Sequence, residues 1–160
     1  MTLISTDRLT LRLKDPEELR TQIASLPEEA RREVSREWLR MVEQSDEPDP
    51  WIHGFDTELS DGTMVGGCGF KGPPVDQVVE IAYWTAEDFR GRGIATEAAQ
   101  ALADFALQNS DVATVRAHTL PEENASTTVL TKAGFTKTSE VVDPDDGPVW
   151  RWEYSATSSG

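Results

Sequence analysis

The sequence predicts a single domain of mixed α/β architecture, in which strands and helices alternate along the chain. Runs in which polar and apolar residues alternate, typical of strands, are interspersed with segments whose apolar residues recur every three or four positions, typical of helices. The 160 residues contain no internal repeat, and this length suits one domain with its own core. Hydrophobic residues make up 38% of the chain and charged residues 28%, the balance of a folded rather than a disordered protein. We expect the domain to span residues 1–154, followed by a small, polar, disordered tail at 155–160.

The expected elements follow one another without a boundary that would mark a second domain. In chain order they are a strand at 10–13, a helix from residue 16, a helix behind residue 27, strands at 51–59, 63–70 and 78–85, a helix at 94–108, a strand at 114–118, a helix at 124–133, and strands at 136–142 and 149–154. Asp15 and Pro16 are the cap and first residue of the first helix, and a capping-box pattern at Ser25 opens the second. The turn Asp61-Gly62 joins the second and third strands as a hairpin.

Three elements between residues 78 and 134 bear on function. The strand at 78–85 is mostly apolar and rich in β-forming residues, which predicts that both of its faces are covered. The helix that follows carries Ile94, Ala98 and Leu102 at helical spacing, so it presents an apolar stripe to the sheet. The next helix ends at Gly134, a residue suited to the left-handed conformation of a helix end.

Composition excludes several classes of protein. The chain carries 15 Lys and Arg against 29 Asp and Glu, a net charge of -14, which opposes binding to nucleic acid or anionic membranes and favours cationic partners such as amines. One Cys and two His leave neither a disulfide framework nor a zinc cluster, so we expect no metal. No apolar run approaches the roughly 18 residues of a membrane span, and the first residues lack a secretion signal. The sequence therefore predicts a soluble, cytoplasmic protein, either a monomer or a homodimer.

One glycine-rich segment matches the letters of a nucleotide-binding motif but not its structural context. Residues 67–72 match the pattern G-x-G-x-x-G, which must open a helix to bind a dinucleotide. Pro73 and Pro74 follow directly and forbid that helix. The glycines instead indicate a strand with a bulge or a close backbone contact.

The segment 89–96 is a better candidate for anion binding, because it lies between an expected strand and an expected helix. Helix N-termini expose unpaired N–H groups and a partial positive charge, so a glycine-rich turn there can wrap its amides around a diphosphate. Gly91 and Gly93 permit close approach and unusual backbone angles, and Arg90 and Arg92 add positive charge. An ordinary loop that leads into a helix is the alternative.

The pattern Arg90-x-x-Gly93-x-Ala95, after a strand that contains Glu-Ile-Ala-Tyr-Trp, resembles the coenzyme A motif of the GNAT N-acetyltransferases. Residues 121–135 resemble the following family segment, especially in the branch of ribosomal-protein N-terminal acetyltransferases, and residues 5–12 look like that branch's first strand. The resemblance spans nearly the whole chain in the family's order. It leaves the helical region 16–44 and the acidic loop 43–50 undetermined.

The resemblance implies a twisted, mixed sheet of about six or seven strands with helices on both faces. Its fourth and fifth strands, here 78–85 and 114–118, would splay apart to hold acetyl-CoA. Main-chain groups of the fourth strand would pair with the pantetheine arm, the amides of 91–96 would hold the pyrophosphate, and Asn124 would lie near the arm. The cofactor-binding residues implied are Tyr83, Trp84, Thr85, Arg90, Gly91, Arg92, Gly93, Ile94, Ala95, Thr96 and Asn124. Asn124 is equally suited to cap a helix, which is compatible with that role.

Acetyl transfer to an amine needs a neutral amine, a donor for the oxyanion and, in some enzymes, a proton for the departing thiolate. Glu80 is the candidate base, because it interrupts an apolar run and a carboxyl group in apolar surroundings is a stronger base than one in water. It also falls where family members place a Glu that acts directly or through water; a strand Glu that reaches solvent is the alternative. A main-chain N–H of 83–85 would stabilise the oxyanion.

Many relatives carry a proton-donating Tyr where this chain has Leu130. Ser126 matches the Ser proposed for that role in the ribosomal-protein branch, and it suits a helix start equally well. For His53, His118 and Cys68 we expect structural roles.

The sequence thus predicts an acetyl-CoA-dependent N-acetyltransferase that acts on a primary amine, either a protein N-terminus or a small molecule. The amine would attack directly within a ternary complex. The alternative is a non-catalytic coenzyme A binding or sensing module with the same fold.

Overall fold

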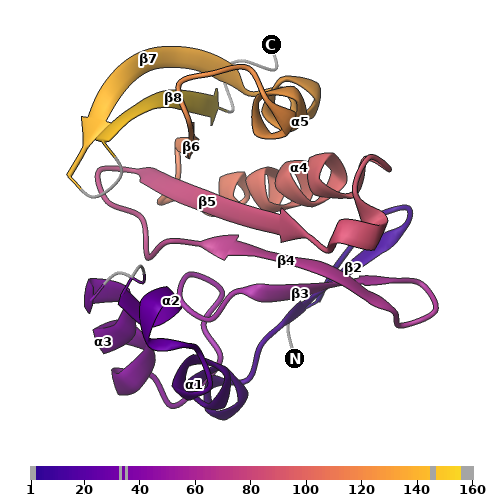
Figure 1. Ribbon diagram of the computed structural model, residues 1–160, viewed down its shortest axis with the longest axis vertical. Coiled ribbons are helices and arrows are strands. Elements are labelled where there is room, and N and C mark those ends of the chain that lie inside the picture. The colour runs from indigo at the N-terminus through magenta and orange to yellow at the C-terminus, as the bar shows by residue number, and fades with distance from the viewer. Residues whose placement is uncertain (1–2, 33, 35, 145–146, 156–160) are drawn as a thin grey trace.

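The computed structural model describes residues 3–32, 34, 36–144 and 147–155. Its described strands form one sheet in the order β1-β2-β3-β4-β5-β6-β8-β7 (Figure 1). The strands are β1 (Leu3–Ser5), β2 (Leu9–Leu13), β3 (Phe55–Leu59), β4 (Met64–Phe70), β5 (Val78–Thr85), β6 (Thr114–Thr119), β7 (Thr136–Asp143) and β8 (Gly147–Ser155). The helices are α1 (Pro16–Ala24), α2 (Glu28–Arg32), α3 (Arg36–Gln44), α4 (Ile94–Leu107) and α5 (Ala125–Ala133), with a 3-10 turn, η1, at Glu87–Phe89.

The sheet is mixed, as expected, and it parts between β5 and β6. All neighbouring strands pair in antiparallel fashion except β5 and β6, which run parallel and pair only over Val78–Glu80 and Thr114–Arg116. Beyond those three pairs the two strands diverge, which confirms the predicted splay. The sheet has 8 strands rather than six or seven, because the three-residue strand β1 pairs with β2.

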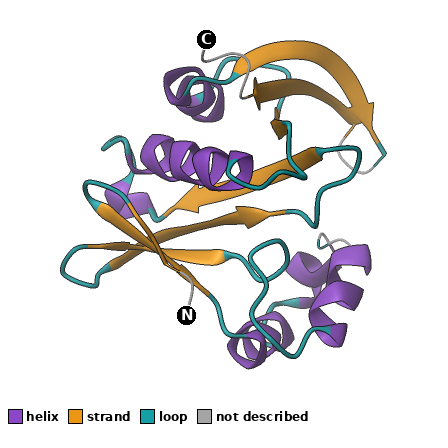
Figure 2. Ribbon diagram, turned by 180° about the vertical axis from the view of Figure 1, so that it is seen from behind, coloured by secondary structure: helices purple, strands orange, loops and turns teal. Residues whose placement is uncertain are grey.

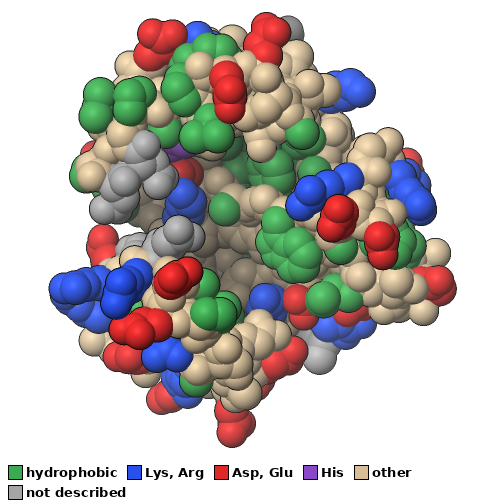
Figure 3. Space-filling view, viewed as in Figure 1, with side chains coloured by type: hydrophobic (Ala, Val, Ile, Leu, Met, Phe, Trp, Pro, Cys, Tyr) green, Lys and Arg blue, Asp and Glu red, His purple; other side chains and the backbone are tan. Residues whose placement is uncertain are grey.

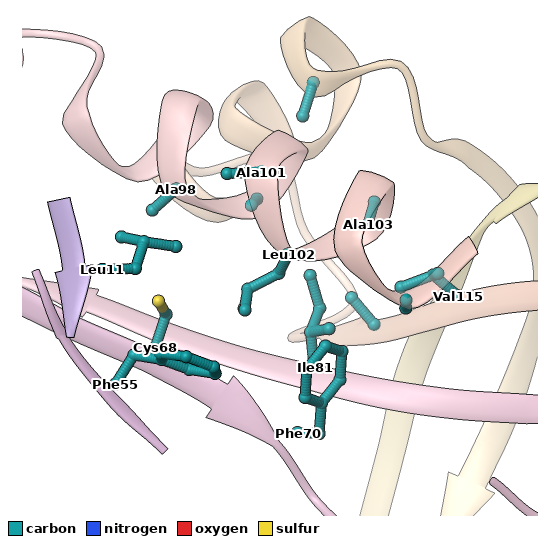
Figure 4. Packing of buried hydrophobic residues seen from close by; sticks show 14 of the residues in the cluster. Leu11, Phe55, Cys68, Phe70, Ile81, Ala98, Ala101, Leu102, Ala103 and Val115 are labelled. Atoms are coloured by element: carbon teal, nitrogen blue, oxygen red, sulfur yellow. The ribbon is translucent and has the colours of Figure 1, made fainter. Parts of the chain in front are cut away.

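Helix α4 covers one face of the sheet, on the side nearer the viewer in Figure 2. Its buried residues are mostly alanines, and their small side chains let the helix approach the strands closely. Figure 4 shows Ala98 and Leu102 of α4 above Leu11, Cys68 and Ile81 of the sheet. These five side chains are all buried, at 8% exposure or less. The predicted apolar stripe of this helix is therefore confirmed.

The opposite face of β5 is open, so the expectation that both faces of this strand are covered was wrong. Val79 and Ile81 are buried beneath α4, whereas Ala82 and Trp84 on the other face are exposed, Trp84 by 54%. Neighbouring strand β4 carries Gly67 at this face, and a Cβ there would lie only 2.5 Å from the Trp84 indole nitrogen. Figure 3 shows that this side of the molecule is hollowed between the α1–α3 region and the β7–β8 hairpin.

The N-terminal helices form a small separate core. Leu19, Val42 and Ile52 are buried together. The structure has two helices, α2 and α3, where the sequence predicted one, and residues 33 and 35 between them lie outside the described residues.

The strand predicted at 51–59 begins only at Phe55. The amides of Ile52 and His53 both donate to the carbonyl oxygen of Asp49, which makes residues 49–53 a turn. Of the predicted tail at 155–160, Ser155 completes β8, and 156–160 lie outside the described residues, as do 145 and 146 of the β7–β8 turn.

Candidate active site

The loop between β5 and α4 presents a row of unpaired main-chain amides. Gly91 and Gly93 have φ angles of 78° and 79°, in the left-handed region that favours glycine. Gly93 is the N-cap of α4 and contributes no capping side chain. Within the part of the chain that the structure describes, the amides of residues 91–96 find no acceptor. Because a helix N-terminus also carries the positive end of the helix dipole, this loop has the donors that an anion requires.

Arg8 and Glu97 hold this loop against the edge of the sheet. Arg8 donates through Nη1 to the carbonyl oxygen of Arg92 at 2.9 Å and through Nε to Glu97 Oε1 at 2.8 Å. Burial alone would raise the pKa of Glu97, but hydrogen bonds from Thr6 and Arg8 outweigh burial and hold this pKa below its usual value. Arg8 thus fixes the loop through its main chain, a role that the sequence analysis did not identify.

The two arginines of the loop partly engage the protein itself. Arg90 Nε donates to the carbonyl oxygen of Thr85 at 3.2 Å, so it links the loop to the end of β5. The guanidinium of Arg92 lies over the ring of Phe89, 5.4 Å from its centroid. Both residues are exposed, and each leaves further guanidinium N–H groups available to a ligand.

Tyr83 turns its main-chain groups toward the gap between β5 and β6. The carbonyl oxygen of Glu80 accepts from the Lys71 amide, and the amide of Ala86, just after β5, donates to the carbonyl oxygen of Val65. The main-chain groups of even-numbered residues in this segment therefore face β4. Main-chain groups of a strand alternate between its two edges, which directs Tyr83 and Thr85 to the other edge. β6 has already diverged there.

The main chain of Trp84 faces β4 instead. A Cβ on Gly66 would meet the Trp84 carbonyl oxygen at 2.3 Å, which places that oxygen against β4. Of the three predicted residues of β5, Tyr83 and Thr85 therefore present main-chain groups to the gap, and Trp84 presents its indole to the open face.

Asn124 begins α5 and caps it. Its side-chain oxygen accepts from the amide of Thr127 at 3.1 Å, in a capping box completed by the Thr127 hydroxyl, so the structural alternative considered for this residue is observed. The side-chain NH₂ of Asn124 donates to no other described residue. The cap therefore leaves this amide nitrogen available to a ligand.

Ser126 and Tyr83 meet between α5 and β5. The Tyr83 hydroxyl donates to the main-chain carbonyl oxygen of Ser126 at 3.4 Å. Burial raises the pKa of Tyr83 to about 12, so its hydroxyl stays protonated at neutral pH. The Ser126 side chain, half-buried in the first turn of α5, has its hydroxyl unengaged among the described residues. Two hydroxyl groups therefore lie at this side of the gap.

Glu80 stands on the open face of β5 within a polar cluster, not in an apolar environment as the sequence suggested. Its Oε2 lies 3.0 Å from Lys71 Nζ and 3.0 Å from His118 Nδ1, and the Glu80 side chain is 27% exposed. Its other oxygen, Oε1, has no partner among the described residues. A pocket of about 380 Å³, lined in part by Lys71, Pro73 and Val78, adjoins this carboxylate. One carboxylate oxygen is thus fixed and the other is left for a ligand.

His118 also contacts β8, through Arg151. Arg151 Nε donates to His118 Nε2 at 3.1 Å. Because a guanidinium can only donate, Nε2 accepts this hydrogen bond and the ring proton is assigned to Nδ1, which lies 3.0 Å from Glu80 Oε2. The sequence predicts a structural role for His118 and gives no sign of Arg151 as its partner, because their pairing across β6 and β8 becomes visible only in the fold.

The structure therefore brings the predicted residues to two places along β5. Tyr83, Thr85 and the loop amides lie at its C-terminal end, and Glu80 lies about 10 Å earlier at the rise of an extended strand. Asn124 caps α5, and Ser126 in its first turn accepts from the Tyr83 hydroxyl through its main-chain oxygen, which connects α5 to β5. Among the described residues there is no group of His, Cys, Asp and Glu suited to a metal ion.

Comparisons with known proteins identify the family and the fold. The family model described as "Acetyltransferase (GNAT) domain" matches residues 3–136. A Bacillus subtilis protein, the uncharacterised N-acetyltransferase YjdG, is 36% identical over 73 residues, which are 45% of this chain and 44% of that protein. The matched part thus spans less than half of that relative's length.

Solved structures share the fold across nearly the whole chain. AAC(6')-Ib in complex with ribostamycin and coenzyme A superposes with a TM-score of 0.69 at 20% identity, covering 96% of both chains. RimL, a ribosomal L7/L12 α-N-protein acetyltransferase in complex with coenzyme A, reaches 0.72 at 16% identity and covers 98% of this chain and 99% of its own. At these identities the likeness concerns the fold alone.

Proposed function

The chain belongs to the acetyltransferase (GNAT) family, and on this premise we propose that it is an acetyl-CoA-dependent N-acetyltransferase whose acceptor is a primary amine. The observation that supports the proposal best is the row of unpaired amides at residues 91–96, which stands at the end of β5 where β6 turns away. A diphosphate at those amides would direct the rest of the cofactor along the gap.

The residues present fit coenzyme A. We assign the pyrophosphate to the amides of 91–96, with Arg90 and Arg92 as added positive charge. The pantetheine arm, which carries amide groups, would pair with main-chain groups of Tyr83 and Thr85 at the free edge of β5. The Asn124 side-chain NH₂ is a further donor at the other wall of the gap.

The cofactor supplies an acetyl group activated as a thioester, and residues of this chain would position and deprotonate the amine. Glu80 Oε1 is the proposed acceptor for a proton of the amine, directly or through water, because Oε2 is occupied by Lys71 and His118. The main-chain N–H of Tyr83 faces the gap and would donate to the acetyl oxygen.

Ser126 is the proposed proton donor to the departing thiol. It stands at the gap in the first turn of α5, where its hydroxyl is unengaged among the described residues. Tyr83, whose pKa of about 12 keeps its hydroxyl protonated, is the neighbouring donor. Replacing Ser126 with Ala, alone and together with Tyr83→Phe, separates the two: a loss of turnover only in the double variant would show that Tyr83 supplies the proton.

Direct attack within a ternary complex is favoured over transfer through the protein. Cys68 is the single cysteine, and it is buried at 8% exposure with its pKa raised to about 12 by burial. A thiol of this kind is not a thiolate at neutral pH, so Cys68 is unsuited to carry the acetyl group.

The experiment that tests the function is release of coenzyme A thiol over a panel of amines. The panel contains N-terminal peptides, amino acids and polyamine antibiotics, since the solved relatives include proteins named for a ribosomal protein and crystallised with an aminoglycoside. We expect amine-dependent thiol release. Tight cofactor binding in calorimetry without turnover on any amine would favour the alternative, a non-catalytic coenzyme A binding module.

A further inference from the structure

Arg151 is a half-buried residue that pairs with no carboxylate among the described residues, and His118 lies between it and the carboxylate proposed to meet the amine. Its Nε donates to the neutral nitrogen Nε2 of His118. Among the described residues no carboxylate pairs with it, and its two Nη groups donate to no protein acceptor. This positive charge is therefore uncompensated in the protein as described, although the chain as a whole carries a net charge of -14.

The neighbouring residue pair shows what the fold does elsewhere. Arg116 on β6 stands opposite Glu153 on β8, and its Nε and Nη2 both donate to Glu153 Oε2, at 2.9 and 2.7 Å. Two pairs further along the same two strands, and so on the same face, Arg151 stands opposite His118 instead of a carboxylate. The same sheet face therefore contains one arginine that is neutralised internally and one that is not.

A neutral histidine also connects Arg151 to Glu80 without cancelling either charge. The His118 ring separates the guanidinium from the carboxylate: it accepts a hydrogen bond of 3.1 Å from Arg151 Nε, and its Nδ1 lies 3.0 Å from Glu80 Oε2. Glu80 Oε1 and both Arg151 Nη groups are left without partners in the described chain. An acceptor that contacts both needs an amine and an anionic group in the same molecule.

From this arrangement we propose that the acceptor is an amine that also carries a carboxylate, with the carboxylate bound by the Nη groups of Arg151 and the amine by Glu80 Oε1. The inference rests on the proposed function and names its substrate class. A guanidinium suits a carboxylate because its planar fork can donate two parallel hydrogen bonds. Two sources present this chemistry: a free amino acid, and a peptide with an acidic residue near its N-terminus.

The test compares matched acceptors with the wild-type enzyme. L-amino acids are compared with their amides, and peptides with an acidic second residue are compared with the same peptides carrying the neutral amide. We expect the specificity constant to be about 10- to 100-fold higher for the carboxylate form, because a hydrogen bond to a charged group is lost in the neutral form. The pair of acceptors that shows this ratio identifies the source of the carboxylate.

Arg151→Gln should abolish that preference by lowering the specificity constant for carboxylate acceptors and not for their amides. Arg12→Gln is the control, since it breaks the ion pair between Arg12 on β2 and Glu58 on β3, away from Glu80, and should leave the ratio between the acceptors unchanged. Equal use of both forms by the wild type, or an equal loss on both in Arg151→Gln, would overturn the proposal.

A binding measurement separates this proposal from the proposed function. Calorimetry of the complex with coenzyme A, titrated with an amino acid and with its amide, reports the preference even where no turnover occurs. A preference for the carboxylate that Arg151→Gln removes supports the acceptor class, whatever the outcome of the thiol-release assay. The absence of any preference in binding and turnover refutes it.

Discussion

His118 Nδ1 lies 3.0 Å from Glu80 Oε2, across the point at which β5 and β6 separate. This contact gives Glu80 an environment that differs from the one suggested by the apolar residues around it in sequence. Because Lys71 Nζ lies 3.0 Å from the same oxygen, the carboxylate is held from two sides, by the residue that follows β4 and by β6. The environment of the proposed base is therefore made by residues remote in the chain.

Glu80→Gln should lower turnover roughly 100-fold at pH values below the acceptor's pKa, because the amide keeps the size of the side chain and removes the base. The effect should shrink at higher pH, where the amine is already neutral. Cofactor affinity, measured by calorimetry, should stay within a factor of two of the wild type by this reasoning, since Glu80 lies about 10 Å along β5 from Tyr83. A pH–rate profile identical to that of the wild type would remove Glu80 as the base.

His118→Asn should retain much of the activity that His118→Ala loses. The Asn side-chain NH₂ can replace the Nδ1–H donor to Glu80, whereas Ala leaves that oxygen with Lys71 alone. We expect the loss in His118→Ala to appear in turnover and in the shape of the pH–rate profile, with cofactor affinity unchanged. Nitrogen NMR of the His118 ring checks the premise directly: it should show the neutral Nδ1–H tautomer, and the opposite tautomer would contradict the assignment.

Gly93→Val should weaken coenzyme A binding at least tenfold and lower the unfolding temperature. A side chain at φ 79° is strained by about 1–2 kcal/mol, and its Cβ would lie 3.3 Å from Arg8 Nη2, in the contact that holds the loop. Gly62→Ala is the matched control, with φ 89° and nothing within 4 Å of the added Cβ. It should lose stability of similar size while its cofactor affinity stays that of the wild type; equal affinity in Gly93→Val would refute the proposed diphosphate site.

His53 should make stability depend on pH. It is 1% exposed, its Nδ1 accepts from the Asp49 amide at 2.9 Å, and burial lowers its pKa below 6.5. The unfolded chain therefore takes up this proton at a higher pH than the folded chain, so stability is full above about pH 6.5 and is lost as the pH falls through the window below it. His53→Asn keeps an acceptor for Asp49 and cannot titrate; thermal unfolding from pH 7 to 5 should show a smaller decline than in the wild type. Parallel declines would count against His53 as the source.

The sequence predicted most of the functional frame because its signals are local. Strand 78–85, the start of α4 at Ile94 and the end of α5 at Gly134 are all set by residue spacing and by glycines with left-handed backbone angles. The splay of β5 and β6 was expected from the family resemblance and is present in the residue pairing.

What the sequence did not predict depends on contacts between distant residues. The cluster of Lys71, Glu80, His118 and Arg151 draws on β4, β5, β6 and β8, and none of these residues indicates its partners by spacing. The open face of β5 was missed for a related reason: an apolar strand predicts coverage, but Trp84 lies over Gly67 and not beneath a helix. The break between α2 and α3 likewise interrupts a helical pattern that runs through it.

Only three residue pairs join β5 to β6, so within the sheet the molecule is two leaves hinged at Val78–Glu80. A ligand that lies in the gap would contact both parts of the sheet and stabilise their position relative to each other. Amide hydrogen exchange in β6 and β8 should then slow when coenzyme A is added, while exchange in β2 and β3, remote from the hinge, stays constant. Because so few residue pairs join β5 to β6, a small molecule bound in the gap would change how often the two parts of the sheet separate.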